Sequence, residues 1–85
     1  MPRSQFSEAY RSFLEVLVSA RKGAGLTQTE LADRLGRRQG FVSIVETGVR
    51  RVDLIEFCAI AKAIGRDPVE LFSRVYESLP DHVDI

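Results

Sequence analysis

Signals that start and stop helices divide this chain into short segments. "TQTE" at residues 27–30 and "DLIE" at residues 53–56 each place a capping side chain three residues ahead of a glutamate, which is the pattern of a capping box. "DPVE" at residues 67–70 adds a proline at the first helical position, where proline is favoured. Glycine closes helices because it tolerates a left-handed backbone, and glycines stand at positions 23, 25, 36, 48 and 65. The chain therefore favours several short helices.

The spacing of apolar residues between these signals predicts five helices and no strand. Apolar residues recur three and four positions apart, which is the period of an amphipathic helix, and no stretch has the alternation of a half-buried strand. We expect helices over residues 7–22, 28–35, 39–46, 54–64 and 68–79. For 85 residues one domain is the default. We place it at residues 1–79 and expect residues 80–85 to form a flexible C-terminal tail.

The net charge is zero, which argues against a protein that binds nucleic acid through bulk charge alone. The charge is nevertheless segregated along the chain. Residues 34–51 hold five arginines against one glutamate, a net charge of +4, whereas residues 52–85 hold three basic against seven acidic side chains, a net charge of −4. A solvated arginine-rich loop would also explain the positive block, so charge alone does not establish a nucleic-acid contact.

Several classes of protein are disfavoured by the sequence. No apolar run approaches the roughly 20 residues of a membrane helix, and residues 1–20 lack the pattern of a signal peptide. Cys58 lies in an apolar segment with no histidine nearby, which indicates an inert thiol, and His82 falls in the expected tail. Nothing has the spacing of zinc ligands. We therefore expect no enzyme, no metal, no cofactor and no membrane association, in a cytoplasmic protein.

Residues 27–47 have the layout of two short helices joined by a turn at Gly36. Phe41, Val42 and Val45 can seat the second helix on a core. A short turn between helices of about two turns each forces a steep crossing, as in a helix-turn-helix. This geometry alone is weakly specific, since many small helical proteins contain such a corner.

The detailed pattern around this corner contains six short elements: Gly25-Leu26, Thr27-Gln28, Leu31-Ala32, Gly36, Glu46-Thr47-Gly48 and Ala61-Lys62-Ala63-Ile64-Gly65. This pattern resembles the Cro/C1-type (XRE) helix-turn-helix family of transcriptional regulators. The family combines a glycine-leucine turn, a Thr/Ser-Gln pair, Leu-Ala, a glycine turn, a reading helix that ends in Glu-x-Gly, and an Ala-x-x-Leu/Ile-Gly helix. The resemblance covers residues 10–75 and implies an all-α, five-helix, lambda-repressor-like DNA-binding domain.

The resemblance also implies individual DNA contacts. Gln28 begins the second helix, where the family commonly contacts a phosphate and where a helix favours an anion. Gln39 begins the reading helix, where the family often places a base-reading side chain, and glutamine can bond adenine. Ser43 is a further candidate for a phosphate or base contact. For each of the three, a simply solvated side chain is the alternative interpretation.

Four arginines bracket the reading helix, and side chains so placed can neutralise phosphates on either side of a major groove. They are Arg37, Arg38, Arg50 and Arg51. The outward positions 40 and 44, by contrast, depart from the family pattern, which often has polar residues there. We expect Gly40 to let the backbone approach the groove and Ile44 to pack on a thymine methyl group. The alternatives are that a partner protein covers Ile44, or that it is simply exposed, as single apolar residues often are.

Two further sets of residues have expected structural roles. The family pattern places a basic residue opposite Glu46, so we expect an Arg21–Glu46 salt bridge between the first and third helices. The last helix carries two apolar stripes, which is more apolar surface than one core face needs. We therefore expect a homodimer interface that includes Val75, Tyr76 and Leu79.

These observations predict a sequence-specific regulator that binds double-stranded operator DNA as a homodimer, with its third helix in the major groove and a location at the nucleoid. The alternative is a protein-binding helix-turn-helix module, antitoxin-like or an anti-activator, that docks another regulatory protein and binds DNA weakly. The zero net charge favours this alternative somewhat, as does the lack of a hydrogen-bonding side chain at positions 40 and 44. The salt dependence of DNA binding distinguishes the two.

Overall fold

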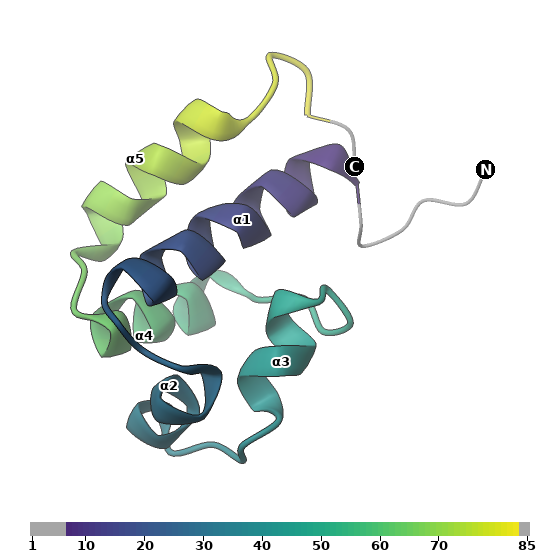
Figure 1. Cartoon of the computed structure of the whole chain (residues 1–85). Coiled ribbons are helices and arrows are strands. Elements are labelled where there is room, and N and C mark those ends of the chain that lie inside the picture. Colours follow the sequence, from purple (N-terminus) through teal and green to yellow (C-terminus); the bar gives the residue numbers. More distant parts are fainter. Residues whose placement is uncertain (1–6, 84–85) are drawn as a thin grey trace.

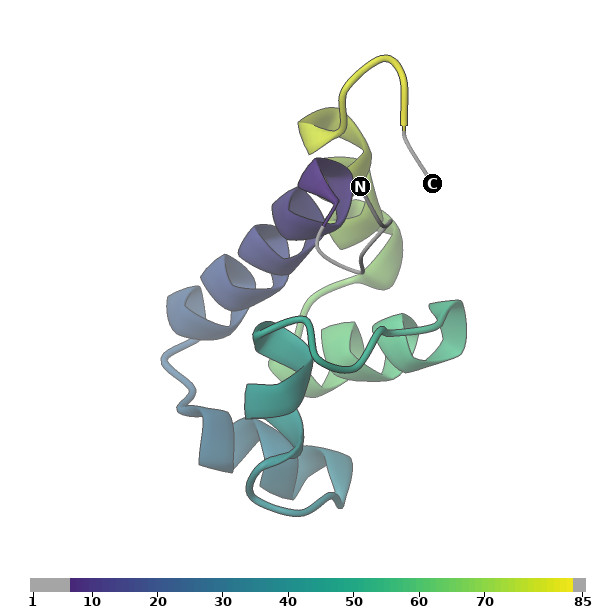
Figure 2. The same cartoon turned by 90° about the vertical axis from the view of Figure 1, so that its right-hand side faces the viewer.

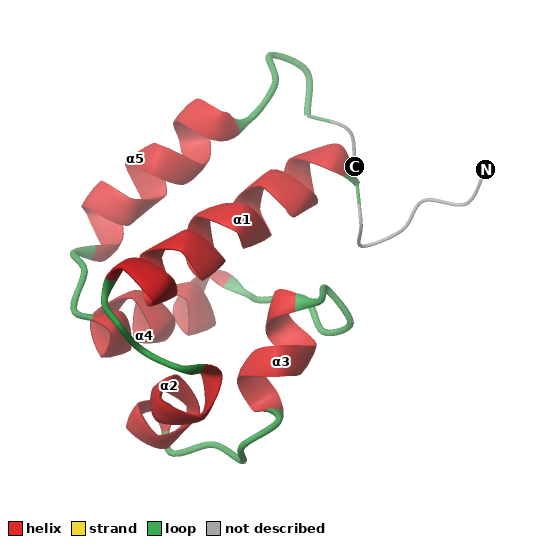
Figure 3. Ribbon diagram, in the orientation of Figure 1, coloured by secondary structure: helices red, strands yellow, loops and turns green. Residues whose placement is uncertain are grey.

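The computed structural model describes residues 7–83, and this part of the chain forms five α-helices and no strand (Figures 1 and 3). The helices are α1 (Glu8–Gly23), α2 (Gln28–Leu35), α3 (Phe41–Glu46), α4 (Leu54–Ile64) and α5 (Pro68–Ser78). The all-α, five-helix prediction is therefore confirmed. The first six residues of the expected domain and the last two of the expected tail lie outside the described residues. Within the described part, no helix is long and apolar enough to cross a membrane.

Local caps fix where the helices begin and end. The hydroxyl of Thr27 accepts a hydrogen bond from the backbone N–H of Glu30 at 3.0 Å, and the Glu30 carboxylate accepts one from the N–H of Thr27 at 2.9 Å. The same reciprocal pair joins Asp53 and Glu56, at 2.7 and 3.0 Å. Gly36 closes α2 with a φ of 69°, a conformation that glycine adopts at little cost.

The third helix begins two residues later than the sequence pattern predicts. The expected start is Gln39, whereas the first helical residue is Phe41, whose backbone N–H donates to the carbonyl of Arg38 at 3.0 Å. Gly40 is the N-cap and has no side chain with which to cap α3. Gln39 and Gly40 therefore lie in the turn that leads into α3.

Helix α1 runs through the middle of the fold, with α5 on one side and α3 and α4 on the other (Figure 1). Helix α2 packs against α3 and α4. The core receives apolar residues from every helix: Leu17, Ala20, Leu31, Ala32, Val42, Val45, Phe57, Ile60, Ala61, Ile64, Leu71 and Val75. Because each helix buries one face here, the short α2 and α3 are held by the rest of the domain and do not depend on their intrinsic helix stability.

The last helix divides its apolar residues between the core and the surface. Val75 is 7% exposed and belongs to the core of its own chain. It is therefore not available to the dimer interface expected for it, whereas Tyr76 is exposed and Leu79 is half-buried. An exposed stripe on the other side of the helix, called here the α5 stripe, consists of Val69, Phe72 and Tyr76.

Candidate nucleic-acid interface

Helices α2 and α3 form a steep corner at one end of the molecule. In Figure 1 α2 is viewed nearly along its axis while α3 is seen from the side, and Figure 2 shows α2 lengthwise. The turn between them starts at Gly36, and the backbone N–H of Arg37 donates to the carbonyl of Ala32 at 3.0 Å, which closes the end of α2. Two short helices that cross steeply after a glycine turn constitute a helix-turn-helix.

A buried ion pair ties the end of α3 to α1. Arg21 Nε donates to Glu46 Oε2 at 2.7 Å and Arg21 Nη2 donates to Glu46 Oε1 at 3.0 Å. The two side chains are only 8% and 7% exposed. Arg21 Nη1 also donates to the carbonyl of Leu26 at 2.8 Å, and Gln28 Nε2 donates to Glu46 Oε1 at 2.9 Å. This network fixes the orientation of α3 relative to α1 and to the start of α2.

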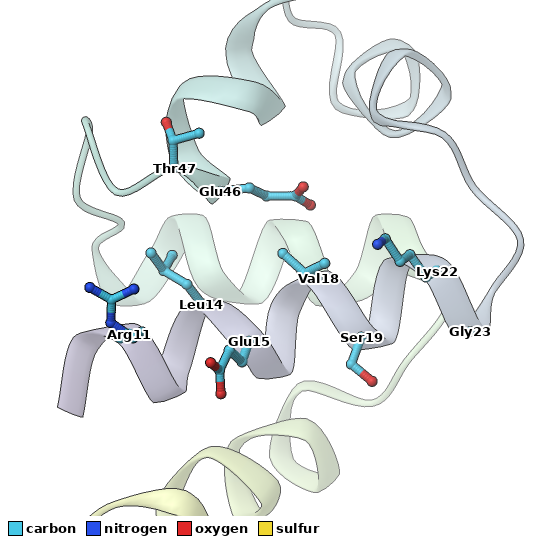
Figure 4. Close-up of a pocket in the computed structure, with 9 residues that line it drawn as sticks. All are labelled: Arg11, Leu14, Glu15, Val18, Ser19, Lys22, Gly23, Glu46 and Thr47. Carbon is cyan, nitrogen blue, oxygen red and sulfur yellow. The ribbon is translucent and has the colours of Figure 1, made fainter. Parts of the chain in front are cut away.

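The network gives Gln28 a contact within the protein, because one of its amide N–H groups donates to Glu46. Figure 4 shows the same junction from the side of an open groove, where Glu46 and Thr47 lie across from Leu14 and Val18 of α1. The carboxylate of Glu46 turns toward α1 and is paired there. Its negative charge therefore does not oppose an anion on the outward side of α3.

The outward side of α3 offers few hydrogen-bonding side chains. Ile44 is 42% exposed, Ser43 is half-buried, and Gln39 is exposed in the preceding turn. An open hollow at the start of α3 combines two apolar side chains with two arginines and two glycines, and is lined by Gly36, Arg37, Arg38, Gly40, Phe41 and Ile44. The surface that the sequence predicts to read DNA is thus exposed, with basic groups beside an apolar centre.

Two arginines lie over the ring of Phe41, the first residue of α3. The guanidinium carbon of Arg37 lies 4.4 Å from the ring centroid and that of Arg50 lies 5.4 Å from it, within the range of a cation–π contact. Arg50 is also paired with Glu56 through two hydrogen bonds, Nη2 to Oε2 at 2.6 Å and Nη1 to Oε1 at 3.0 Å. The structure therefore joins the residues before α3 and after α3 into one cluster.

The cluster perturbs the ionisation of its carboxylate. Hydrogen bonds from Arg50 and from the backbone N–H of Asp53 lower the pKa of Glu56 from 4.5 to about 2, with a smaller contribution from the positive charge of Arg37. The same hydrogen bonds from its guanidinium raise the pKa of Arg50. Glu56 is therefore an anion at every physiological pH and stays paired with Arg50 in the free protein.

The other two arginines are placed differently. The guanidinium carbon of Arg51 lies 4.1 Å from the centroid of Tyr10, whose hydroxyl accepts a hydrogen bond from the backbone N–H of Val52 at 3.0 Å. Arg51 thus lies against α1 and helps to anchor the loop between α3 and α4. Arg38 is exposed and its side chain makes no hydrogen bond or ion pair with residues 7–83, so it is available to an incoming anion.

Comparison with known proteins agrees with this geometry. A helix-turn-helix family model matches residues 17–71. One similar solved structure, an XRE-family like protein from Pseudomonas syringae pv. tomato str. DC3000, shares 46% sequence identity over 86% of this chain and 89% of that chain, with a TM-score of 0.79. The chain belongs to the XRE helix-turn-helix family. No curated protein matches it.

Membership of the XRE family identifies the fold as that of a DNA-binding regulator and not of an enzyme. In this XRE-family chain α2 and α3 are the helix-turn-helix, and α1, α4 and α5 support it. Among residues 7–83 no group of three or more His, Cys, Asp or Glu side chains is placed to hold a metal ion.

Sequence reasoning assigns no role at the interface to three residues that contact its arginines: Tyr10, Phe41 and Glu56. The pattern indicates Phe41 as a core residue and Glu56 as part of a capping box, and both descriptions are incomplete. Arg37 lies in the turn before α3, so its contact with Phe41 does not follow from helical spacing. The contacts of Glu56 with Arg50 and of Tyr10 with Arg51 depend on how the loop folds back, which no local pattern encodes.

Proposed function

We propose that this protein is a sequence-specific regulator that binds double-stranded operator DNA as a homodimer, in the cytoplasm and at the nucleoid. The observation that carries the proposal is the placement of α3: Ile44 on its outward side is exposed, a buried ion pair fixes it to α1, and two arginines lie beside its first turn. Rigid presentation of a short helix, with cations beside it, suits insertion into a major groove between two phosphate backbones.

In this arrangement phosphate contacts position α3 and base contacts provide specificity. Arg37, Arg38 and Arg50 would neutralise phosphates beside the first turn of α3. Gln39 and Ile44 would face base edges, with Ile44 against a thymine methyl group. Because few polar groups are available here, DNA shape would supply part of the specificity, and the preference over random DNA would be modest.

Dimerisation would use the α5 stripe together with Leu79. The stripe is apolar and exposed, with Val69 at 74%, Phe72 at 50% and Tyr76 at 68%, whereas an ordinary surface scatters such residues singly. A two-fold axis along α5 would pair the stripe with itself. It would have to bring the two copies of α3 about 34 Å apart, one helical turn of DNA.

A protein-binding module remains the second candidate, because the hollow at the start of α3 has Phe41 and Ile44 among its lining residues and no uncharged hydrogen-bonding side chain. Such a hollow also suits an apolar side chain of a partner. The two candidates differ at Ile44. If it reads a thymine, Ile44→Ala and a thymine-to-uracil change at that position each weaken binding, but together cost little more than either alone.

The experiment that tests the proposal is selection from random duplexes with the purified protein, followed by titration of the selected duplex at several salt concentrations. A regulator should select a two-fold-related site, and the logarithm of its affinity should fall steeply with the logarithm of salt concentration. Failure to enrich any sequence, together with a flat salt dependence, would reject the proposed function in favour of the protein-binding module.

A further inference from the structure

The pairing of Arg50 with Glu56 places a carboxylate where the proposed function needs a phosphate. Glu56 receives both arms of the Arg50 guanidinium, at 2.6 and 3.0 Å, which is the fork geometry that arginine forms with carboxylates and phosphates alike. The side chains are 38% and 29% exposed, so an anion in solvent can reach the pair. Arg50 in the free protein is therefore already occupied by an anion of its own chain.

The ring of Phe41 is the second element of this cluster. It lies between the residues before α3 and the loop after it, and both Arg37 and Arg50 lie within cation–π distance of it. The ring is half-buried against the core, so its position is set by packing. Because the ring is fixed and contacts both guanidinium groups, it restricts the positions that these two cations can take, whichever anion they bind.

We propose that Glu56 is an internal substitute for a DNA phosphate, which holds Arg50 in the free protein and is displaced when DNA binds, while Phe41 keeps Arg37 and Arg50 beside α3 during the exchange. This inference rests on the proposed function and deepens it. Glu56 and Phe41 are positioning residues in this account, because both act on DNA through the arginines.

The exchange lowers affinity for all DNA sequences by the same factor. Arg50 gains a phosphate but loses a carboxylate, and the freed Glu56 carboxylate must then attract a cation from solution, next to the negative backbone. The net release of counterions is thus smaller than for an unpaired arginine, and the salt dependence is less steep. Since contacts to bases are unaffected, the ratio of operator affinity to non-specific affinity stays the same, and only the overall occupancy of DNA falls.

The test is Glu56→Gln, because glutamine at this position preserves the capping box with Asp53, while it removes the charge and one of the two acceptors for Arg50. We expect about three- to tenfold tighter binding to random and selected duplexes at moderate salt. The slope of log affinity against log salt concentration should be steeper by up to about one unit, which is the contribution of one phosphate contact. Thermal denaturation verifies that the variant is folded. In an Arg50→Ala background the same change should have no effect on the slope.

A matched control is Glu70→Gln, since Glu70 also stands three residues after a cap, in α5, and pairs with Arg66 at 2.8 Å. It removes the same charge far from α3 and should leave DNA affinity unchanged, with sedimentation verifying the oligomeric state. For the ring, Phe41→Leu should weaken binding to all duplexes and flatten the salt slope, and Phe41→Tyr should restore both.

The inference is overturned if Glu56→Gln leaves affinity and slope unchanged, or weakens binding, because Glu56 would then orient Arg50 or be irrelevant to DNA. It is equally overturned if the gain persists in the Arg50→Ala background, which would reveal a general charge effect. In each of these cases the unaltered protein still binds DNA with a steep salt dependence. If it shows no such binding, the proposed function fails and this inference fails with it.

Discussion

The buried Arg21–Glu46 pair should control the stability of this domain more than any exposed ion pair in it. Both side chains are more than nine-tenths buried, and two hydrogen bonds of 2.7 and 3.0 Å join them. Glu46→Ala leaves the Arg21 guanidinium buried with only the Leu26 carbonyl as a partner. Removing one member of a buried pair costs about 3–5 kcal/mol, because the other charge stays desolvated and unpaired.

That cost is large for a chain of 85 residues. At roughly 0.05–0.15 kcal/mol per residue, the whole free energy of unfolding is about 4–13 kcal/mol. The variant should therefore lose about a quarter of its stability or more, and its melting temperature should fall by about 4–8 °C for each kcal/mol lost. Glu46→Gln keeps a hydrogen-bond acceptor for Arg21 and should cost less, so it remains measurable if Glu46→Ala does not fold.

Equilibrium unfolding in urea, followed by circular dichroism, measures the loss. The control is Arg66→Ala, because the Arg66–Glu70 pair is 29% and 52% exposed and exposed pairs contribute about 0–1 kcal/mol. The double variant Arg21→Met/Glu46→Leu should recover much of the stability, since an apolar pair of similar volume avoids desolvation. If Glu46→Ala costs no more than Arg66→Ala, the argument from burial is wrong.

Three further outcomes are expected. Arg51→Ala should weaken binding to every duplex equally and flatten the salt slope by about one unit; an unchanged slope would leave Arg51 as a partner of Tyr10 alone. Replacing Tyr76 and Leu79 with glutamate should give folded monomers by sedimentation, with weak DNA binding, whereas a monomeric unaltered protein would reject the α5 interface. The pKa of Glu56 is lowered from 4.5 to about 2, so its contribution to stability is present above pH 4.5 and is lost as pH falls toward 2. Urea unfolding across that window should show a flatter pH dependence for Glu56→Gln.

The helix boundaries were predictable where the signals are local. The capping box of Thr27 and Glu30 and the left-handed Gly36 depend only on residues a few positions apart, so the sequence pattern specifies them. The start of α3 was not predictable in this way. Gly40 supplies no cap, and the turn is closed by a backbone hydrogen bond from Phe41 to Arg38, which any residue except proline at position 41 could donate.

The contacts that a side chain makes with residues distant in the sequence were less predictable, because they depend on how the helices and loops pack. The two apolar stripes of α5 are visible from their period, but the period does not say which stripe faces the core. Packing against α1 and α4 selects Leu71 and Val75, and this removed Val75 from the expected interface. Arg50 likewise lies near two carboxylates, Asp53 and Glu56, and only the fold of the loop pairs it with Glu56.

Gly40 provides the sharpest test of how closely α3 approaches DNA. Its φ of −80° and ψ of −5° are open to any residue, and a Cβ built there meets no described atom within 4 Å. Gly40→Ala should therefore fold normally and gain up to about 1 kcal/mol from the reduced entropy of the unfolded chain. If the backbone lies against the groove, the added methyl group should nevertheless weaken DNA binding at least tenfold, about 1.4 kcal/mol. Gly36→Ala is the opposite control, because its φ of 69° should make that variant less stable. A Gly40→Ala protein that is more stable and binds the selected duplex with unaltered affinity would show that the bare start of α3 does not face the groove, and would favour a protein partner at this position.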